Sequence, residues 1–244
     1  MKSVLTKASS TSCVAKIAIS LFLALALGLG LVGCASNSGS SNSGSDSAST
    51  EKANNPTESN PIVVDKDKKE VKYLAEVNGI YFTENTRHGI VFKDGSNGDK
   101  SVLRGLGDEK EFYKAMADLG FEEGNNLTAN DMSAPEGQGK SIEGQKLDIT
   151  IEWDGQSAIP IEKCFKPTTG EAKTADWRFG GNLERANAKN TGCVLCLDSC
   201  AVGICSDASW VSNTTANNVT WFNGVEDVLP ADGTKVIVTF KAKN

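Results

Sequence analysis

The chain has 244 residues, 31 acidic and 25 basic side chains, a net charge of −6, seven cysteines and a single histidine. An acidic chain of this kind is a poor match for nucleic acid or anionic lipid headgroups, which bind basic surfaces. The single histidine, His88, restricts Ser-His-Asp or Cys-His catalysis to one position, and no G-x-S-x-G elbow accompanies it.

Residues 1–33 have the profile of a secretory signal peptide. Three lysines and no acid precede an apolar run over residues 17–32, which is shorter than the roughly 20 residues of a membrane span. The run ends in Leu31-Val32-Gly33-Cys34, which looks like a bacterial lipobox, in which the cysteine is acylated and becomes the new N-terminus. The alternative is an ordinary secretory signal that happens to contain a cysteine. We expect a lipidated Cys34 and an extracytoplasmic protein anchored to the cell membrane.

Residues 34–60 comprise the lipidated cysteine and a tether. The tether is nearly all Ser, Gly, Asn, Ala, Thr and Asp, a composition that buries too little apolar surface to offset the entropy of ordering. Loss of the leader removes three lysines and no acid, so the net charge falls from −6 to −9. The remaining residues, 61–244, are long enough for one domain with a core of its own.

The elements of this domain are mostly strand-like. Short β-branched and aromatic runs predict strands over residues 71–77, 79–83 and 89–92, with Asn78-Gly79 as a hairpin turn between the first two. Alternating apolar residues predict two more strands over 147–153 and 236–240.

One helix is marked from Asp108 to Gly120. Asp108 can cap it, Glu111 completes a capping box, and Phe112 and Met116 share one face. The sequence therefore predicts an α+β domain, mainly antiparallel, with one or two helices covering the sheet. The segment from Cys193 to Cys205 is predicted as a loop or short helical turns, since glycines punctuate it and no alternation persists.

Several segments together resemble the YdjY-domain family, bacterial proteins described as ferredoxin-like or iron–sulfur proteins. These segments are AEVNGIYFTENTRHGIVFKDGSNGDKS from Ala75, then LGFEEGNNLT, FGGNLERA, TGCVLCLDSCAVGI and DVLPADGTKVIVTF. The resemblance covers nearly all of residues 70–244, and TGCVLCLDSC is its most specific part. It implies a functional site at Cys193, Cys196 and Cys200, and it implies that Cys164 and Cys205 are additions of this chain.

The cysteines at 193, 196, 200 and 205 have the spacing C-x2-C-x3-C-x4-C, which allows several kinds of chemistry. This spacing is not that of bacterial or plant-type ferredoxins, although four thiolates suit an iron–sulfur cluster. The leader has no twin arginine, so a cluster would have to be assembled outside the cell. Zinc needs only deprotonated ligands, and three thiolates with His88, or four thiolates, would satisfy it.

Disulfides are the ordinary state of cysteines in an exported protein. Five cysteines remain after loss of Cys13 and lipidation of Cys34, so two bridges leave one thiol over. Cys164 and Cys205 are a candidate disulfide pair, and Cys193 with Cys196 could instead form a C-x-x-C redox pair. A hydrogen-bonded structural role remains the alternative for His88.

Gly180-Gly181 before Asn182 is interpreted as a bend, because the glycine spacing of a dinucleotide fingerprint is absent. Arg178 and Arg185, on either side of that bend, are interpreted as salt-bridging side chains rather than an anion site.

These observations lead to a membrane-anchored extracytoplasmic lipoprotein with a metal-binding or redox accessory role. Its ligands would be Cys193, Cys196, Cys200 and Cys205 with His88, its cofactor an iron–sulfur cluster, zinc or none, and its partners redox proteins of the membrane or surface. The alternative is an interaction or solute-binding lipoprotein whose cysteines form only structural disulfides. The motifs give no support to an enzymatic activity, and the sequence sets no oligomeric state.

Overall fold

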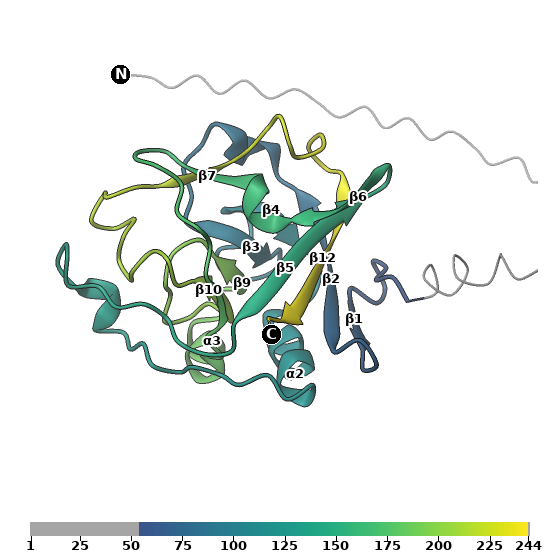
Figure 1. Ribbon diagram of the computed structural model, residues 1–244, viewed down its shortest axis with the longest axis horizontal. Helices are drawn as coiled ribbons and strands as arrows, with labels where there is room; N and C mark the ends of the chain where they lie inside the picture. Colours follow the sequence, from purple (N-terminus) through teal and green to yellow (C-terminus); the bar gives the residue numbers. More distant parts are fainter. Residues whose placement is uncertain (1–53, 244) are drawn as a thin grey trace, which may run out of the picture. The chain divides into compact units, whose positions relative to one another are not determined.

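The computed structural model describes residues 54–243 (Figure 1). The predicted signal peptide, Cys34 and most of the predicted tether lie outside the described residues. Within residues 54–243, no helix is both long and apolar enough to span a bilayer.

Ten strands form one mixed sheet in the described part of the chain (Figure 1). In chain order they are β1 (Ile62–Asp65), β2 (Glu70–Val77), β3 (His88–Phe92), β4 (Ser101–Gly105), β5 (Leu147–Trp153), β6 (Gln156–Pro160), β8 (Trp177–Phe179), β9 (Cys193–Cys196), β10 (Cys205–Asp207) and β12 (Lys235–Ala242). Their order across the sheet is β6-β5-β12-β2-β4-β3-β9-β10-β8, and β1 pairs with β2. Two further strands, β7 (Phe165–Pro167) and β11 (Phe222–Gly224), pair separately.

Most strand pairs are antiparallel, but two are parallel. β3 runs parallel to β4, and β9 runs parallel to β10. β3 and β9 themselves pair antiparallel, so the histidine-bearing strand lies directly beside the first cysteine-bearing strand. This arrangement brings together segments that are more than 100 residues apart in the sequence.

The helices are few and short. The described residues contain two α-helices, α2 (Glu109–Asp118) and α3 (Leu183–Lys189), and three 3-10 turns, η1 (Gly79–Phe82), η2 (Asp131–Ser133) and η3 (Ile161–Cys164). The prediction of an α+β domain with covering helices is therefore wrong, and the domain is largely β with a mixed sheet. Short strands that are buried on both faces, such as β9 and β10, have no apolar alternation by which the sequence could reveal them.

Individual elements were predicted with mixed success. The strands at β2, β3, β5 and β12 and the helix α2 are confirmed, and the Asp108 carboxylate caps α2 by accepting from the backbone N–H groups of Lys110 and Glu111. The predicted strand after Asn78 is wrong, because Gly79–Phe82 forms η1. The Gly79 N–H donates to Asp232 (2.8 Å), a contact from the far end of the chain that local sequence does not encode. The prediction of a loop over the whole cysteine-rich segment is also wrong, because β9 and β10 occupy both of its ends.

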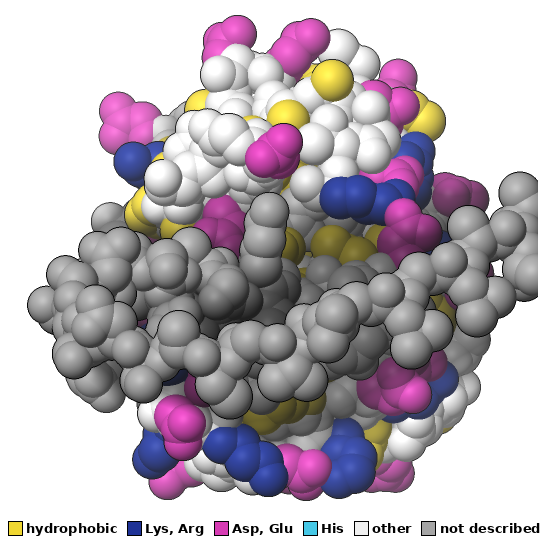
Figure 2. All heavy atoms as spheres, turned by 90° about the vertical axis from the view of Figure 1, so that its right-hand side faces the viewer, with side chains coloured by type: hydrophobic (Ala, Val, Ile, Leu, Met, Phe, Trp, Pro, Cys, Tyr) yellow, Lys and Arg dark blue, Asp and Glu magenta, His cyan; other side chains and the backbone are white. Residues whose placement is uncertain are grey.

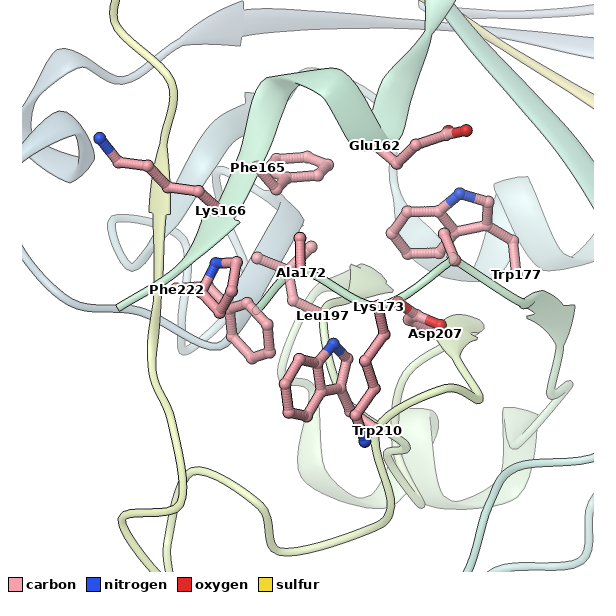
Figure 3. A pocket seen from close by; sticks show the side chains of 12 residues that line it. Glu162, Phe165, Lys166, Ala172, Lys173, Trp177, Leu197, Asp207, Trp210 and Phe222 are labelled. Carbon is pink, nitrogen blue, oxygen red and sulfur yellow. The ribbon is translucent and has the colours of Figure 1, made fainter. Parts of the chain in front are cut away.

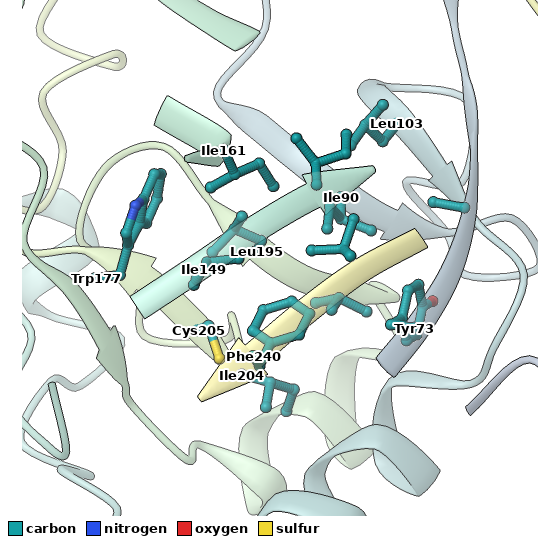
Figure 4. Close-up of a cluster of buried hydrophobic side chains, with 14 of the residues drawn as sticks. Tyr73, Ile90, Leu103, Ile149, Ile161, Trp177, Leu195, Ile204, Cys205 and Phe240 are labelled. Carbon is teal, nitrogen blue, oxygen red and sulfur yellow. The ribbon is translucent and has the colours of Figure 1, made fainter. Parts of the chain in front are cut away.

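The main core lies around the central strands (Figure 4). Phe112 of α2 packs against Tyr73 of β2 and Phe240 of β12, with ring centroids 5.5 Å and 4.6 Å apart. Each such buried ring contributes about 1.5–3 kcal/mol through removal from water. Leu195 and Cys205 are part of the same core, which therefore reaches the cysteine-bearing strands.

Acidic and basic side chains are interspersed on the face shown in Figure 2. That face carries no broad basic patch among its described residues, in keeping with the acidic composition.

Candidate metal centre

Cys193 and Cys196 lie on the same face of the sheet, although residues three apart in a regular strand point to opposite faces. The cause is an irregular register between β3 and β9. His88 lies opposite Cys196, Ile90 opposite Leu195 and Val91 opposite Cys193, with shifts between these pairs. Such bulges re-aim side chains. As a result both thiols lie outside the main core and form a separate buried cluster with Val91 and Cys200.

Cys200 lies in the turn between β9 and β10, and this turn is held from outside by Asn182. The Asn182 side-chain amide donates to the backbone carbonyls of Cys200 (3.1 Å) and Gly203 (2.8 Å). Arg185 of α3 donates from Nε to the Ala201 carbonyl and from Nη2 to Asn182 Oδ1, both at 2.6 Å. The conformation of the cysteine turn is therefore fixed by the FGGNLERA segment.

Gly203 is required by the close packing of this turn. A Cβ at this position would lie 2.8 Å from Cys196 Sγ, closer than side-chain atoms approach one another. The turn thus folds directly over the central sulfur of the cluster.

His88, the first residue of β3, completes the group. Its Nδ1 lies 3.6 Å from Cys193 Sγ, and the ligand atoms of His88, Cys193 and Cys196 all lie within 4.8 Å of one another. The three cysteines are buried, whereas His88 is half-buried. We call His88, Cys193, Cys196 and Cys200 the Cys/His centre.

The three thiols of the centre share protons unequally. The hydrogen bond from Cys196 holds the pKa of Cys193 well below its usual range, with a further contribution from His88. The pKa of Cys200 is lowered to about 7, first by the hydrogen bond from Cys196 and then by the charge of Arg87. Hydrogen bonds from Cys196 to the sulfurs of Cys193 and Cys200, together with burial, raise the pKa of Cys196 well above its usual value. Cys193 and Cys200, the two hydrogen-bonding neighbours of Cys196, are therefore the thiols that lose a proton most readily.

A buried ion pair stands beside these sulfurs. Arg87 donates from Nε (3.0 Å) and Nη2 (2.5 Å) to Oδ1 of Asp198, whose side chain is fully buried. Burial lowers the pKa of Arg87, but Asp198 and the thiols of Cys200 and Cys196 outweigh it, so the pKa of Arg87 is raised. The guanidinium is thus a fixed positive charge next to the thiols.

The other predicted site residues lie elsewhere. Cys205 faces the main core with Leu195, because parallel pairing places these two residues side by side and Cys196 on the opposite face. Cys164 lies in the same core. Burial raises the pKa of both thiols, to about 12 for Cys164, where Glu162 also contributes. All five cysteines of the described residues are free thiols. The disulfide between Cys164 and Cys205 is not formed in this structure and stays a prediction.

Several residues of the site were missed by sequence reasoning. Arg87, Asp198 and Asn182 were not singled out, and Arg185 was interpreted as a salt-bridging side chain. The available signals were the position of Arg87 next to the only histidine and the occurrence of Asn182 and Arg185 in FGGNLERA, one of the segments that resemble the family. Arg178 does form a salt bridge, with Asp176 at 2.8 Å, as predicted.

A small pocket with aromatic walls lies beside Leu197, the residue that follows β9 (Figure 3). Its rings are those of Phe165, Trp177, Trp210 and Phe222. The Lys173 ammonium lies 4.0 Å from the centre of the Trp210 ring and donates to the Ser209 carbonyl (3.0 Å). The Lys173 ammonium therefore already occupies the position over Trp210 that a cationic ligand would take. For this reason the pocket is a weaker candidate for a ligand site than the Cys/His centre.

The donor set of the Cys/His centre fits a soft metal. Two thiols and one imidazole converge within 4.8 Å, and Cys200 stands beside them through its hydrogen bond with Cys196. Sulfur and imidazole donors of this kind suit zinc, copper(I) or iron–sulfur clusters rather than magnesium or calcium. With metal–sulfur and metal–nitrogen bonds of about 2.3 Å and 2.0–2.1 Å, the sulfur and nitrogen of a tetrahedral site lie about 3.6 Å apart. The observed 3.6 Å between Cys193 Sγ and His88 Nδ1 matches this separation, and it equally fits the hydrogen bond that joins the two groups in this structure. The chain therefore presents these two donors at metal-binding spacing.

Comparison with known proteins gives two matches. The model of the YdjY domain family matches residues 62–241. A protein of Escherichia coli (strain K12), named "Uncharacterized protein YdjY", is 42% identical over 185 residues, which cover 75% of this chain and 79% of that protein. No solved structure matches the chain.

Proposed function

The chain belongs to the YdjY-domain family, and we propose that this member is a membrane-anchored extracytoplasmic lipoprotein whose Cys/His centre binds a metal ion or metal cluster in a non-catalytic accessory role. The anchor in this proposal rests on the lipobox that ends at Cys34, and the metal rests on the geometry of the centre.

The single observation that carries the metal proposal is the convergence of His88, Cys193 and Cys196 within 4.8 Å. Cys200 adds a third sulfur through its hydrogen bond with Cys196. Because thiolates and imidazole must lose their protons to bind metal, the lowered pKa values of Cys193 and Cys200 favour binding near neutral pH.

Electron transfer is the more specific role that would follow if the bound metal is iron. The half-buried His88 is the ligand of the centre nearest to solvent, and so it is the point where a membrane or surface redox protein could approach. The alternative of a scaffold with purely structural disulfides has less support, because the five described cysteines are free thiols.

The test is the composition of the full-length protein, purified anaerobically in detergent from membranes of its native host. We expect about one equivalent of zinc, or iron with inorganic sulfide, and loss of this metal in Cys196→Ser. Cys205→Ala is the matched control, because it removes a buried thiol of the adjoining strand that faces away from the centre. Metal-free protein with a Cys193–Cys196 disulfide would refute the proposal.

A further inference from the structure

Two buried hydroxyls beside the Cys/His centre have no hydrogen-bond partner, those of Thr191 and Ser206. An unpaired buried hydroxyl costs about 1–3 kcal/mol, so native proteins seldom retain one without a reason. Each of these two hydroxyls is placed next to a different sulfur of the centre.

Ser206 lies next to Cys196. The two residues are directly paired across the parallel strands β9 and β10, so their side chains leave the sheet on the same face. A Cβ at Gly203 would meet Cys196 Sγ at 2.8 Å and Ser206 Oγ at 3.3 Å. Both atoms therefore line the same small space, which only a glycine leaves open.

Thr191 lies next to Cys193, two residues before it and at the entrance of β9. Its hydroxyl makes no hydrogen bond of regular geometry, but it lies close enough to Cys193 Sγ to contribute to the lowered pKa of that thiol, after the larger contributions of Cys196 and His88. The hydroxyl is therefore an unpaired donor within reach of this sulfur.

Arg87 is the positive charge near the third sulfur, that of Cys200. It binds Asp198 through Nε and Nη2, so its Nη1 is not used in the ion pair. Asp198 is itself fixed, because its second oxygen accepts from the N–H (3.4 Å) and hydroxyl (3.3 Å) of Thr215. The positive charge is thereby held in one place next to the thiols.

We propose that these two hydroxyls and the guanidinium are positioning groups, each assigned to one sulfur, that stabilise the three sulfurs as thiolates when a metal is bound. A thiolate accepts several hydrogen bonds, whereas a disulfide sulfur is a weak acceptor that would leave both hydroxyls unpaired. Three thiolates around a divalent ion also leave a negative charge, which a neighbouring guanidinium offsets. This inference rests on the proposed metal-binding function.

The test is a titration of the metal-free, full-length protein in detergent with Co²⁺, followed through its thiolate charge-transfer absorbance. Ser206→Ala and Thr191→Val should each weaken Co²⁺ binding by about tenfold or more, the usual effect of losing a group that orients a ligand. Ser209→Ala is the matched control, because Ser209 also has a buried hydroxyl without a partner but lies outside the centre. It should leave the affinity within about twofold of the unmodified protein, below the range expected for an orienting group.

The charge of Arg87 is tested separately. Replacement of Arg87 alone would strand a buried carboxylate, so Arg87→Gln is combined with Asp198→Asn, which keeps the pair neutral and hydrogen-bonded. We expect this double variant to bind Co²⁺ more weakly than the unmodified protein, and Arg87→Lys to fall between them. If the double variant fails to fold, the two hydroxyl variants decide.

The outcomes separate the two proposals. Failure of the unmodified protein to bind Co²⁺ would overturn the proposed function. Binding by the unmodified protein with unchanged affinity in Ser206→Ala and Thr191→Val would overturn only the present inference. Loss of affinity in both hydroxyl variants, with Ser209→Ala unaffected, would support it.

Discussion

The amide of Asn182 donates to the backbone carbonyl of Cys200, 18 residues later in the chain, at 3.1 Å. Asn182 also holds the Gly203 carbonyl, and its own backbone is in the left-handed conformation, with φ of 57°. The cysteine turn is therefore shaped by a side chain that cannot itself bind a soft metal.

Replacement of Asn182 by glycine should destabilise the protein and weaken Co²⁺ binding. Glycine tolerates the left-handed backbone, so the change isolates the loss of the amide, which leaves two buried carbonyls without their donor at a cost of about 1–3 kcal/mol each. Urea denaturation of the metal-free protein measures the first effect and the Co²⁺ titration the second. Asn190→Gly is the control, because Asn190 has the same backbone conformation at the exposed end of α3. Equal stability of the two variants would contradict this role of Asn182.

Gly203→Ala should disrupt the centre directly. Its Cβ would lie 2.8 Å from Cys196 Sγ, so either the sulfur or the turn must move. We expect a lower melting temperature and a changed Co²⁺ absorbance spectrum, with a cost of about 1–3 kcal/mol typical of overpacking. An unchanged spectrum would show that the turn does not press on the sulfur.

Glu109→Gln should stabilise the protein at neutral pH. Glu109 is buried at the start of α2, its carboxylate has no hydrogen-bond partner and only a long ion pair with Lys110 (3.8 Å), and burial raises its pKa. A raised pKa means that the folded state holds the proton more tightly, so this contribution to stability is present below the unfolded value of about 4.3 and is lost as pH rises.

The measurement for Glu109 is urea denaturation at pH 4 and pH 7. The glutamine variant should exceed the unmodified protein at pH 7 and approach it at pH 4. Glu111→Gln, an exposed position in the same helical turn, should show no such difference. A variant of Glu109 that is less stable at both values would mean that the carboxylate has a favourable role at the helix start.

Cys34→Ser should block processing of the leader, because the lipobox cysteine must be acylated before the leader is removed. We expect the intact mass of the variant to retain residues 1–33 and to lack the lipid. Cys13→Ser, within the leader, should be processed normally. Cleavage of the Cys34 variant at an ordinary secretory site would contradict the lipoprotein proposal.

The sequence predicts the long, amphipathic elements well and the short, buried ones poorly. The apolar periodicity of β5, β12 and α2 is visible in the sequence because one face of each element is exposed to solvent or polar. β9 is buried at every position, so its apolar and sulfur-bearing residues carry no alternation, and the segment reads as a loop. The short strands β9 and β10, which extend the mixed sheet, were missed for the same reason.

The site could be predicted in part. The cysteine spacing and the only histidine identify Cys193, Cys196, Cys200 and His88 as candidates. Their separation from Cys205 depends on which face each strand residue takes, and this depends on the β3–β9 bulge and on the parallel pairing of β9 with β10. The partnership of Arg87 with Asp198 joins residues 111 positions apart, so only the tertiary fold could reveal it.

The burial of three cysteines behind one half-exposed imidazole also has a kinetic consequence. If a metal ion is bound as proposed, a chelator in solution would meet the half-buried His88 before the buried sulfurs. Removal of the ion would then proceed through opening of the turn over Cys196, so the lifetime of the loaded protein would be set by local unfolding rather than by the strength of the chelator.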